Sequence, residues 1–476
     1  MLLFVKIVII KLELGQGEFR NGESAHGAAS DGTPSNRANK YIDSLAGGSR
    51  WYNSSGSSGT VTISYALLDG ADPKGLFSGN GYSWSVAFEA ALTGAMSAWE
   101  AVAAVDFVST TYDAADIWYW SNDSDQIGDS SYLGSHDFPY YGSEPLYGMF
   151  NNQYTYANTT AVGGLMYNTF VHELGHGLGL AHPHDGGYGK SATNFPGVSS
   201  AFGDYGTYNL NQGIYTVMSY NDGWSDAPTP SSYIYGSSVG PMALDIAAIQ
   251  MIYGANTSYA TGASTYTLPT ENTAGTGWSC IWDAGGTDVI SNAGSSTACT
   301  INLNAATLTG TYGGGYVSRN SSIIGGFTIA NGVVIENATG GSGADTITGN
   351  SASNTLSGGG GADTLTGGLS GDILIGGTGA DIFNFDSTSE VSSGSYADVI
   401  TDFTHGTDYI DLSGIDANTK KKGDQVFLYS SNSTYKAYSV WLKDEVLYGD
   451  VNGKKGAEFH IVLTDVTVLD KWDFFL

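Results

Sequence analysis

Hydrophobic and polar positions follow two different patterns along the 476 residues of the chain. In the first part, apolar side chains recur at helical spacing over residues 88–102 and 244–252, so each segment is expected to form a helix with one buried face. Residues 60–65 alternate in polarity and residues 115–119 form a mainly apolar run, as strands do. Helical spacing disappears after residue 254. The pattern therefore predicts helices and strands in one region and strands alone in the next.

Three segments follow from this pattern. Residues 15–39 are rich in Gly, Ser, Asn and Ala without periodicity, and we interpret residues 1–40 as a flexible leader or propeptide. Residues 41–254 are expected to form an α+β domain and residues 255–476 an all-β domain, since a chain of this length is expected to hold more than one domain. Residues 1–10 are apolar but interrupted by a lysine, so they predict neither a membrane span nor a Sec signal peptide.

A nine-residue repeat occupies part of the second region. Five consecutive units run from residue 340 to residue 384, and each has a Gly-rich first half and an apolar eighth position. The sixth positions are Asp345, Asn354, Asp363, Asp372 and Asp381. The strict period and the regular apolar position argue against a disordered Gly-rich linker. The pattern resembles the repeat of RTX proteins, which folds as a parallel β-roll and binds Ca²⁺, a cation that prefers carboxylate and carbonyl oxygens.

Three histidines lie at the spacing of a catalytic zinc site. His172 and His176 are four residues apart, so a helix would place both rings on one face. We expect this helix to start near Asn168 and to end at Gly179, where a left-handed turn would bring His182 back toward the first two rings. Three imidazoles leave one zinc coordination position open, which is typical of catalytic rather than structural sites.

Other residues agree with this chemistry. Glu173 follows the first histidine, where its carboxylate can take a proton from a water activated by zinc without being a ligand. Met218 can pack beneath the imidazoles as an apolar, polarizable side chain, and the phenolic oxygen of Tyr220 could reach the metal. Three of the 8 histidines of the chain fall in this single window, which argues against incidental histidines on a surface helix.

The histidine pattern, the Val-Met-Ser-Tyr string around Met218 and the segment 241–255 resemble those of the serralysins, secreted bacterial zinc endopeptidases of the metzincin class. The resemblance implies a metzincin catalytic domain in which the three histidines and Tyr220 hold one zinc ion and Met218 forms a structural turn. It implies that Glu173 is the general base and that Tyr220 moves to hydrogen-bond the oxyanion. It also implies that residues 115–119 form an edge strand that pairs with an extended peptide substrate.

The resemblance further implies which residues hold the several calcium ions. Within the repeats, the sixth positions supply side chains, whereas the second and fourth positions supply carbonyl oxygens. These carbonyl positions are Gly341, Gly343, Asn350, Ala352, Gly359, Gly361, Gly368, Ser370, Gly377 and Gly379. Because Asn354 replaces an aspartate in the second unit, its site should be weaker. Ligands before the repeats are expected at Asp283, Gly285, Gly286, Asp288, Val334 and Glu336, and in a loop with Ala260, Gly262 and Ser264.

Charge and the C-terminal sequence restrict the partners. The 17 basic and 46 acidic residues give a net charge of −29, which repels nucleic acids and anionic membranes but favours divalent cations. We expect protein or peptide substrates, no nucleic acid, no membrane span and a monomer. The last residues, Asp473-Phe474-Phe475-Leu476, resemble the tail that type I secretion machinery reads in serralysins. The resemblance therefore implies a secreted, extracellular protein.

Two other functions remain open. One is a non-enzymatic, calcium-dependent adhesion protein with an inert metalloprotease-like domain, although an inert domain would not need Glu173. The other is an RTX lipase, which would require a nucleophile elbow of the form G-x-S-x-G, and we expect none. Cys280 and Cys299 are 19 residues apart, close to two repeat units, so we expect them on neighbouring strands within reach of a disulfide. Two buried free thiols are the alternative.

Overall fold

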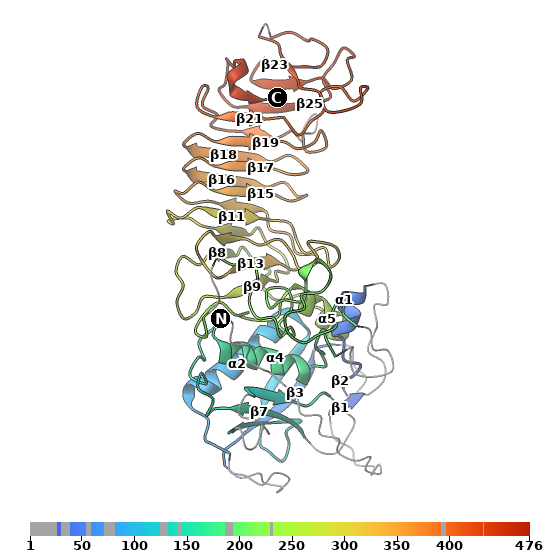
Figure 1. The fold of residues 1–476 in the computed structure, drawn as a ribbon, viewed down its shortest axis with the longest axis vertical. Coiled ribbons are helices and arrows are strands. Elements are labelled where there is room, and N and C mark those ends of the chain that lie inside the picture. The colour runs from blue at the N-terminus through green and yellow to red at the C-terminus, as the bar shows by residue number, and fades with distance from the viewer. Residues whose placement is uncertain are drawn as a thin grey trace.

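The computed structural model describes residues 26–29, 39–53, 59–70, 81–123, 132–139, 145–185, 194–228, 232–391, 397–431 and 433–476. The molecule is elongated, with the helices gathered toward one end and layers of strands stacked toward the end that contains the C-terminus (Figure 1). This is the two-part architecture that the change of periodicity predicts. In the part of the chain that is described, no helix combines the length and the hydropathy that crossing a membrane requires.

The first part is built on a five-stranded sheet. Its strands are β3 (Val61–Leu68), β4 (Val105–Ser109), β5 (Ile117–Asn122), β6 (Gly134–His136) and β7 (Leu146–Asn151). The order is β4-β3-β5-β7-β6, and only β6 runs antiparallel to its neighbour. The prediction of an edge strand at residues 115–119 is therefore wrong. The corresponding strand, β5, is fully buried between β3 and β7, and the edge strand on that side is β6.

Within the described residues, the helices are α1 (Lys40–Leu45), α2 (Val86–Val102), α4 (Leu165–Gly177) and α5 (Ala243–Tyr253), with short 3₁₀ turns at Thr207–Asn209 and Lys471–Asp473. The helices predicted at 88–102 and 244–252 are α2 and α5. Helix α4 begins three residues before the expected start near Asn168. Its N-cap, Gly164, makes no side-chain hydrogen bond, so the start carries no capping signal in the sequence.

The leader contributes one described strand. Strand β1 (His26–Ala29) pairs antiparallel with β2 (Arg50–Asn53). Helix α1 follows β1 along the chain, and the side chain of Asn39 at its N-terminus accepts hydrogen bonds from the backbone N–H groups of Tyr41 and Ile42. The other residues before Asn39 lie outside the described residues, and removal of residues 1–40 as a propeptide stays a prediction.

Strands are the main regular elements of the second part. They are β8 (Thr265–Thr267), β9 (Trp278–Ile281), β10 (Val289–Ser291), β11 (Cys299–Asn302), β12 (Arg319–Asn320), β13 (Gly326–Ile329), β14 (Asn337–Thr339), β15 (Thr346–Thr348), β16 (Thr355–Gly360), β17 (Thr364–Thr366), β18 (Ile373–Thr378), β19 (Ile382–Asn384), β20 (Val399–Ile400), β21 (Tyr409–Asp411), β22 (Leu428–Tyr429), β23 (Ser439–Lys443), β24 (Val446–Gly449), β25 (Phe459–Leu463) and β26 (Phe474–Phe475). A ten-stranded sheet has the order β22-β23-β24-β25-β20-β18-β16-β14-β10-β8, and a seven-stranded sheet has the order β12-β11-β15-β17-β19-β21-β26.

The repeats form the predicted parallel β-roll. Within the repeats, parallel neighbours in each sheet are one 18-residue turn apart, so Thr346 lies opposite Thr364 and Thr355 lies opposite Ile373. Successive nine-residue units alternate between the two sheets. The apolar eighth positions, Ile347, Leu356, Leu365, Leu374 and Phe383, are all fully buried. One nonapeptide thus supplies one strand, and its apolar residue supplies one layer of the core.

A short segment at residues 236–239 joins the two parts. The N–H of Val239 donates to the carbonyl of Trp278 in β9, and Trp278 is fully buried. On the other side, the carbonyl of Ser238 accepts the side-chain N–H of Asn168 in α4, at 3.2 Å. Residues 238 and 239 therefore connect β9 of the second part to α4 of the first part through hydrogen bonds.

The two cysteines do not meet, so the predicted disulfide is wrong. Cys280 lies on β9 opposite Thr328, whereas Cys299 lies on β11 opposite Asn320. The two strands belong to different sheets, and both cysteines are buried free thiols. The 18-residue period holds within the nonapeptide repeats but not in the strands before them, which is why extrapolating it back to these residues failed.

Titration of the protein unfolded without reductant should therefore find two reactive thiols per chain. In the folded protein both should react slowly, because burial hides them and raises the pKa of each, to about 12 for Cys280. The thiolate that reacts is then scarce at neutral pH. Fewer than two thiols after unfolding would contradict the structure.

Candidate active site

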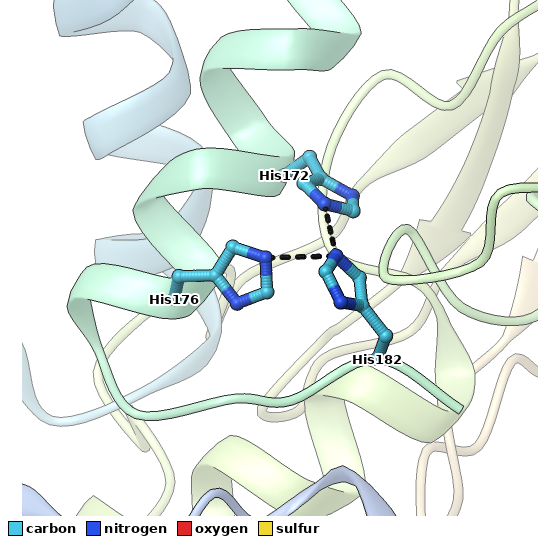
Figure 2. Close-up of side chains that lie close together, drawn as sticks. All are labelled: His172, His176 and His182. Atoms are coloured by element: carbon cyan, nitrogen blue, oxygen red, sulfur yellow. Dashed lines mark hydrogen bonds between the residues drawn. The ribbon is translucent and has the colours of Figure 1, made fainter. Parts of the chain in front are cut away.

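Helix α4 presents two of the predicted ligands, and the segment after it presents the third. Figure 2 shows His172 and His176 on one side of α4, with His182 facing both from the returning chain. The Nε2 atom of His182 lies 3.0 Å from the Nε2 atoms of both His172 and His176. Two nitrogens bound at about 2.0 Å to one tetrahedral zinc are about 3.3 Å apart. The three histidines therefore lie at nearly the spacing that one zinc ion requires.

Hydrogen bonds and burial prepare the imidazoles for a metal. Each Nδ1 atom has an oxygen acceptor, which places the proton there and leaves the Nε2 lone pair free. The acceptors are Val217 O at 2.8 Å for His172, Leu180 O at 2.7 Å for His176 and Asp185 Oδ2 at 2.6 Å for His182. Burial lowers the pKa of His172 to about 4 and lowers the pKa values of His176 and His182, so the rings are neutral at pH 7. The role of Asp185 was not predicted from the sequence.

Gly179 forms the turn after α4, as predicted. Its φ is +102°, a value that side chains with a Cβ rarely adopt, and a Cβ here would overlap the carbonyl oxygen of Ser49. The next residue, Leu180, forms a bridge with Ala46 of the segment after α1. The turn that delivers His182 is thus fixed by backbone contacts with a segment more than a hundred residues earlier.

Met218 lies beneath α4, as predicted for a structural turn. It is fully buried, and a Cβ on Gly175 would lie 2.6 Å from its sulfur, so the thioether is pressed against the helix between the two histidines. Asp245, which was not predicted, holds this turn. Its buried carboxylate accepts the hydroxyl of Thr216 and the N–H of Val217, both at 2.6 Å. Asp245 therefore fixes the carbonyl that orients His172, through contacts that sequence spacing does not indicate.

Glu173 is buried beside the histidines and the edge strand. Its Oε2 atom has no hydrogen-bond partner among the described residues. A Cβ on Gly134 of β6 would lie 2.9 Å from its Cγ, so the edge strand passes directly alongside this carboxylate. Burial raises the pKa of Glu173 to about 8. A cation on the adjacent histidines would favour the ionised form.

Tyr220 lies beside the histidines, as predicted. Its ring centroid is 4.5 Å from that of His182 and 5.8 Å from that of His172. The rings of His184 and Phe202, which were not predicted, contact it with centroids at 4.7 Å and 5.2 Å. Burial and nearby carboxylates raise the pKa of Tyr220, so its hydroxyl keeps its proton and can donate a hydrogen bond.

The aspartates of the repeats form two ladders, one on each side of the roll. In one ladder, Asp363 Oδ1 accepts the N–H of Asp345 and Asp381 Oδ1 accepts that of Asp363. In the other, Asp372 Oδ1 accepts the N–H of Asn354. The second oxygens of Asp363, Asp372 and Asp381 are buried without a hydrogen-bond partner in the described residues. Unpaired buried carboxylate oxygens are costly, and a cation between the turns would satisfy them.

The predicted carbonyl positions lie in the same spaces. A Cβ on Gly361 would lie on the carbonyl oxygen of Gly343, and a Cβ on Gly368 would lie on that of Asn350, one turn earlier. Both glycines have positive φ, +115° and +97°. Carbonyl oxygens of one turn therefore face the next turn next to the unpaired carboxylates. This donor set of carboxylate and carbonyl oxygens fits Ca²⁺.

Three further aspartates continue the ladders and were missed. Asp398 Oδ1 accepts the N–H of Asp372, and Asp408 Oδ1 accepts that of Asp381. Asp402 accepts two glycine N–H groups of the last repeat. Inserted residues break the nine-residue period here, which hid these positions. A signal remained, because Asp398 and Asp408 are each followed two residues later by isoleucine, as Asp345 is.

Some of the predicted ligands before the repeats also come together. Asp288 Oδ1 accepts the N–H of Ser264, and Glu336 Oε2 accepts the N–H of Asp288. A Cβ on Gly286 would lie 2.5 Å from the carbonyl oxygen of Gly262 and 2.9 Å from Asp288 Oδ1. These five residues, which include two of the three carboxylates predicted before the repeats, therefore lie together.

Other predicted ligands are less closely connected to this group. Asp283 Oδ1 accepts the N–H of Gly285 at 2.9 Å, and its Oδ2 accepts the hydroxyl of Tyr266 at 2.6 Å. The side chain of Val334 is exposed, and Ala260 has a positive φ of 49°. Within the described residues, no hydrogen bond links Val334 or Ala260 to the group around Asp288.

One string does have the spacing of a lipase elbow, contrary to expectation, at residues 236–240. Its central Ser238 is fully buried, and its hydroxyl donates to the carbonyl of Gly213 at 2.7 Å. A nucleophile must be exposed and lie next to a base. Ser238 therefore has a structural role at the junction of the two parts.

Comparison with known proteins agrees with this geometry. Residues 82–188 match the matrixin family model, and residues 243–476 match the model of the peptidase M10 serralysin C-terminal domain. Metallopeptidase AprA of Pseudomonas marginalis is 33% identical over 440 residues, which cover 86% of this chain and 87% of that protein. A serralysin of Photorhabdus sp. (strain Az29) is 37% identical over 415 residues, 83% of this chain and 80% of that one. The chain belongs to the serralysin family of metallopeptidases, as its motifs predicted.

Proposed function

We propose that this metalloendopeptidase is a secreted zinc enzyme with Glu173 as general base and a β-roll stabilised by calcium. One observation carries the catalytic part of the proposal. Three neutral imidazoles direct their Nε2 atoms to one point, beside a buried carboxylate oxygen of Glu173 that no described residue hydrogen-bonds. A metal-activated water is the reactant that this arrangement fits best.

The side chains then divide the reaction between them. Zinc, when bound, polarises the scissile carbonyl and lowers the pKa of water. Glu173 removes the proton of the attacking water and delivers it to the leaving amine. The protonated hydroxyl of Tyr220 donates a hydrogen bond to the carbonyl oxygen as negative charge develops on it. His172, His176 and His182 hold the metal, and their Nδ1 bonds keep the rings in place.

The edge strand β6 supplies a docking site for the substrate backbone. Its far side has no neighbouring strand in the described sheet, and Gly134 brings it into contact with Glu173. An extended peptide can pair with such an edge through main-chain hydrogen bonds. We therefore assign pairing with the substrate backbone, which the resemblance implied for residues 115–119, to β6.

We further infer a leader at 1–40, a catalytic domain at 41–254 and a roll at 255–476. The residues proposed as a type I secretion signal are folded in the roll, where strand β26 pairs with β21. Asp473 is buried and accepts the N–H of Gly406. Secretion machinery would therefore read this segment in the unfolded chain, before extracellular calcium folds the roll.

Casein hydrolysis tests the catalytic proposal. A zinc-selective chelator should abolish hydrolysis when calcium is kept in excess, and added zinc should restore it. Keeping calcium in excess separates loss of the catalytic metal from unfolding of the roll. Full activity in protein shown to be free of zinc would overturn the proposal.

Replacing Tyr220 with phenylalanine should lower kcat by on the order of 10²-fold, because the variant loses one hydrogen bond to the developing oxyanion. Zinc content should stay at the wild-type level, since the three histidines and their acceptors are unchanged. Steady-state kinetics and metal analysis on the same sample provide both values. Parallel losses of zinc and turnover would instead show that Tyr220 mainly supports the metal site.

A further inference from the structure

The C-terminal end of α4 contains carbonyl groups that the helix cannot satisfy by itself. The last carbonyls of any helix lack intrahelical donors. Here they are buried next to the histidines, where an unpaired carbonyl would be costly. Their partners come from other parts of the chain.

Two side chains that are distant in sequence supply donors to consecutive carbonyls. The indole N–H of Trp51 in β2 donates to Gly177 O at 2.8 Å, and the hydroxyl of Tyr253 in α5 donates to Leu178 O at 2.7 Å. The same hydroxyl accepts the backbone N–H of Trp51 at 3.2 Å. Trp51 and Tyr253 therefore form one hydrogen-bonded cap on the end of the zinc-binding helix.

The next carbonyls are paired as well. Gly179 O accepts the N–H of Gly47 at 2.7 Å. Leu180 O accepts Nδ1 of His176 at 2.7 Å, so the position of this carbonyl sets the orientation of that ligand. His182 follows two residues later. Any displacement of residues 177–180 would consequently be transmitted to two of the three zinc ligands.

We propose that Trp51 and Tyr253 are positioning residues for the metal centre. They hold the turn at residues 177–180 so that His176 and His182 converge before the metal binds. This inference rests on the proposed zinc site, but neither residue contacts the reacting atoms. Loss of the cap should therefore weaken the hold on zinc and leave the intrinsic rate of the loaded enzyme and its KM unchanged.

Tyr253→Phe is the sharpest test, because it removes one hydroxyl and keeps the ring. Tyr429→Phe is the matched control, since the Tyr429 hydroxyl also donates to a carbonyl, Leu469 O at 2.8 Å, but in the roll. The rate of zinc release into an excess of a chromophoric chelator is measured for both full-length variants in saturating calcium, together with thermal unfolding. Tyr253→Phe should release zinc about five- to tenfold faster than wild type, whereas Tyr429→Phe should match wild type.

A second variant separates positioning from general destabilisation. Trp51→Phe should also accelerate zinc release. In the double variant, the increase in the release rate should be smaller than the product of the two single increases, because both residues belong to one cap. If Tyr253→Phe releases zinc at the wild-type rate, or if Tyr253→Phe and Tyr429→Phe change the release rate equally, the inference is overturned while the proposed function stands. Wild-type protein that binds no zinc would overturn the proposed function and the inference with it.

Discussion

Replacing Glu173 with glutamine should reduce peptidase activity by on the order of 10²- to 10⁴-fold while zinc stays bound. Glutamine has nearly the same shape as glutamate but cannot accept the proton of the attacking water. The three histidines keep their positions, because their acceptors are Val217, Leu180 and Asp185 rather than Glu173. Casein hydrolysis and metal analysis of one preparation measure the two quantities.

Glu100 provides the matched control for this experiment. Its carboxylate accepts the N–H of Phe107 at 2.7 Å, burial raises its pKa, and it lies on α2 outside the proposed site. Glu100→Gln should therefore hydrolyse casein at close to the wild-type rate. Near wild-type activity of Glu173→Gln would exclude Glu173 as the base, and loss of zinc from that variant would give the carboxylate a role in metal binding.

Removal of calcium should unfold the roll in the full-length protein. Without a cation, the Oδ2 atoms of Asp363, Asp372, Asp381 and Asp398 stay buried with no hydrogen-bond partner among the residues that the structure describes. At a free calcium concentration of 100 times the Kd, each site would stabilise the fold by about 2.7 kcal/mol. Emptying several sites would therefore remove a large part of the stability. Far-UV circular dichroism should show loss of strand signal in EGTA and recovery with calcium. The Glu173→Gln background prevents self-digestion during the measurement.

Magnesium is the control, because it is smaller than calcium, demands octahedral geometry and keeps its waters. It should restore much less strand signal than calcium at the same concentration. A strand signal that persists in excess EGTA would contradict the calcium-binding role of the ladders.

The same carboxylates should make stability fall with pH when calcium is absent but not when it is in excess. Burial raises the pKa of Asp363 and Asp372 to about 6 and that of Asp398 to about 8, whereas the pKa of aspartate in an unfolded chain is about 3.9. Without calcium, the folded roll thus binds protons more tightly than the unfolded chain, and its stability should fall as pH rises from about 4 to 8. Calcium would hold these carboxylates ionised in the folded roll, as they are in the unfolded chain, so in excess calcium the fall should disappear and stability should stay nearly constant over the upper part of that interval. Thermal unfolding at several pH values in EGTA and in calcium tests both expectations.

Features defined by local spacing could be predicted from the sequence. The four-residue step between His172 and His176 determines a shared helix face, and the turn at Gly179 needs a conformation that glycine favours. The nine-residue period likewise determines which side chains of the roll are buried. In each case the structural relation lies within a few residues, so a sequence contains it directly.

Features that depend on pairing between distant segments could not be predicted in this way. The order of strands puts β5 inside the sheet and β6 at its edge, and the residues of β5 and β6 do not specify this order. The contact of Asp245 with the turn before Met218 and the separation of Cys280 from Cys299 onto different sheets are non-local in the same sense. Asp398 was hidden for another reason, because an insertion interrupts the period that identified its equivalents.

The junction at residues 236–239 has a thermodynamic consequence for the whole enzyme. Because this segment bonds to β9 on one side and, through Ser238, to α4 on the other, order in either part reduces the entropic cost of ordering the other. The proposed binding of calcium to the roll and of zinc to the histidines would then be coupled, and each should strengthen the other by the same factor. The surrounding calcium concentration would thus control how firmly the enzyme holds its catalytic metal, so that peptidase activity develops only where calcium is plentiful.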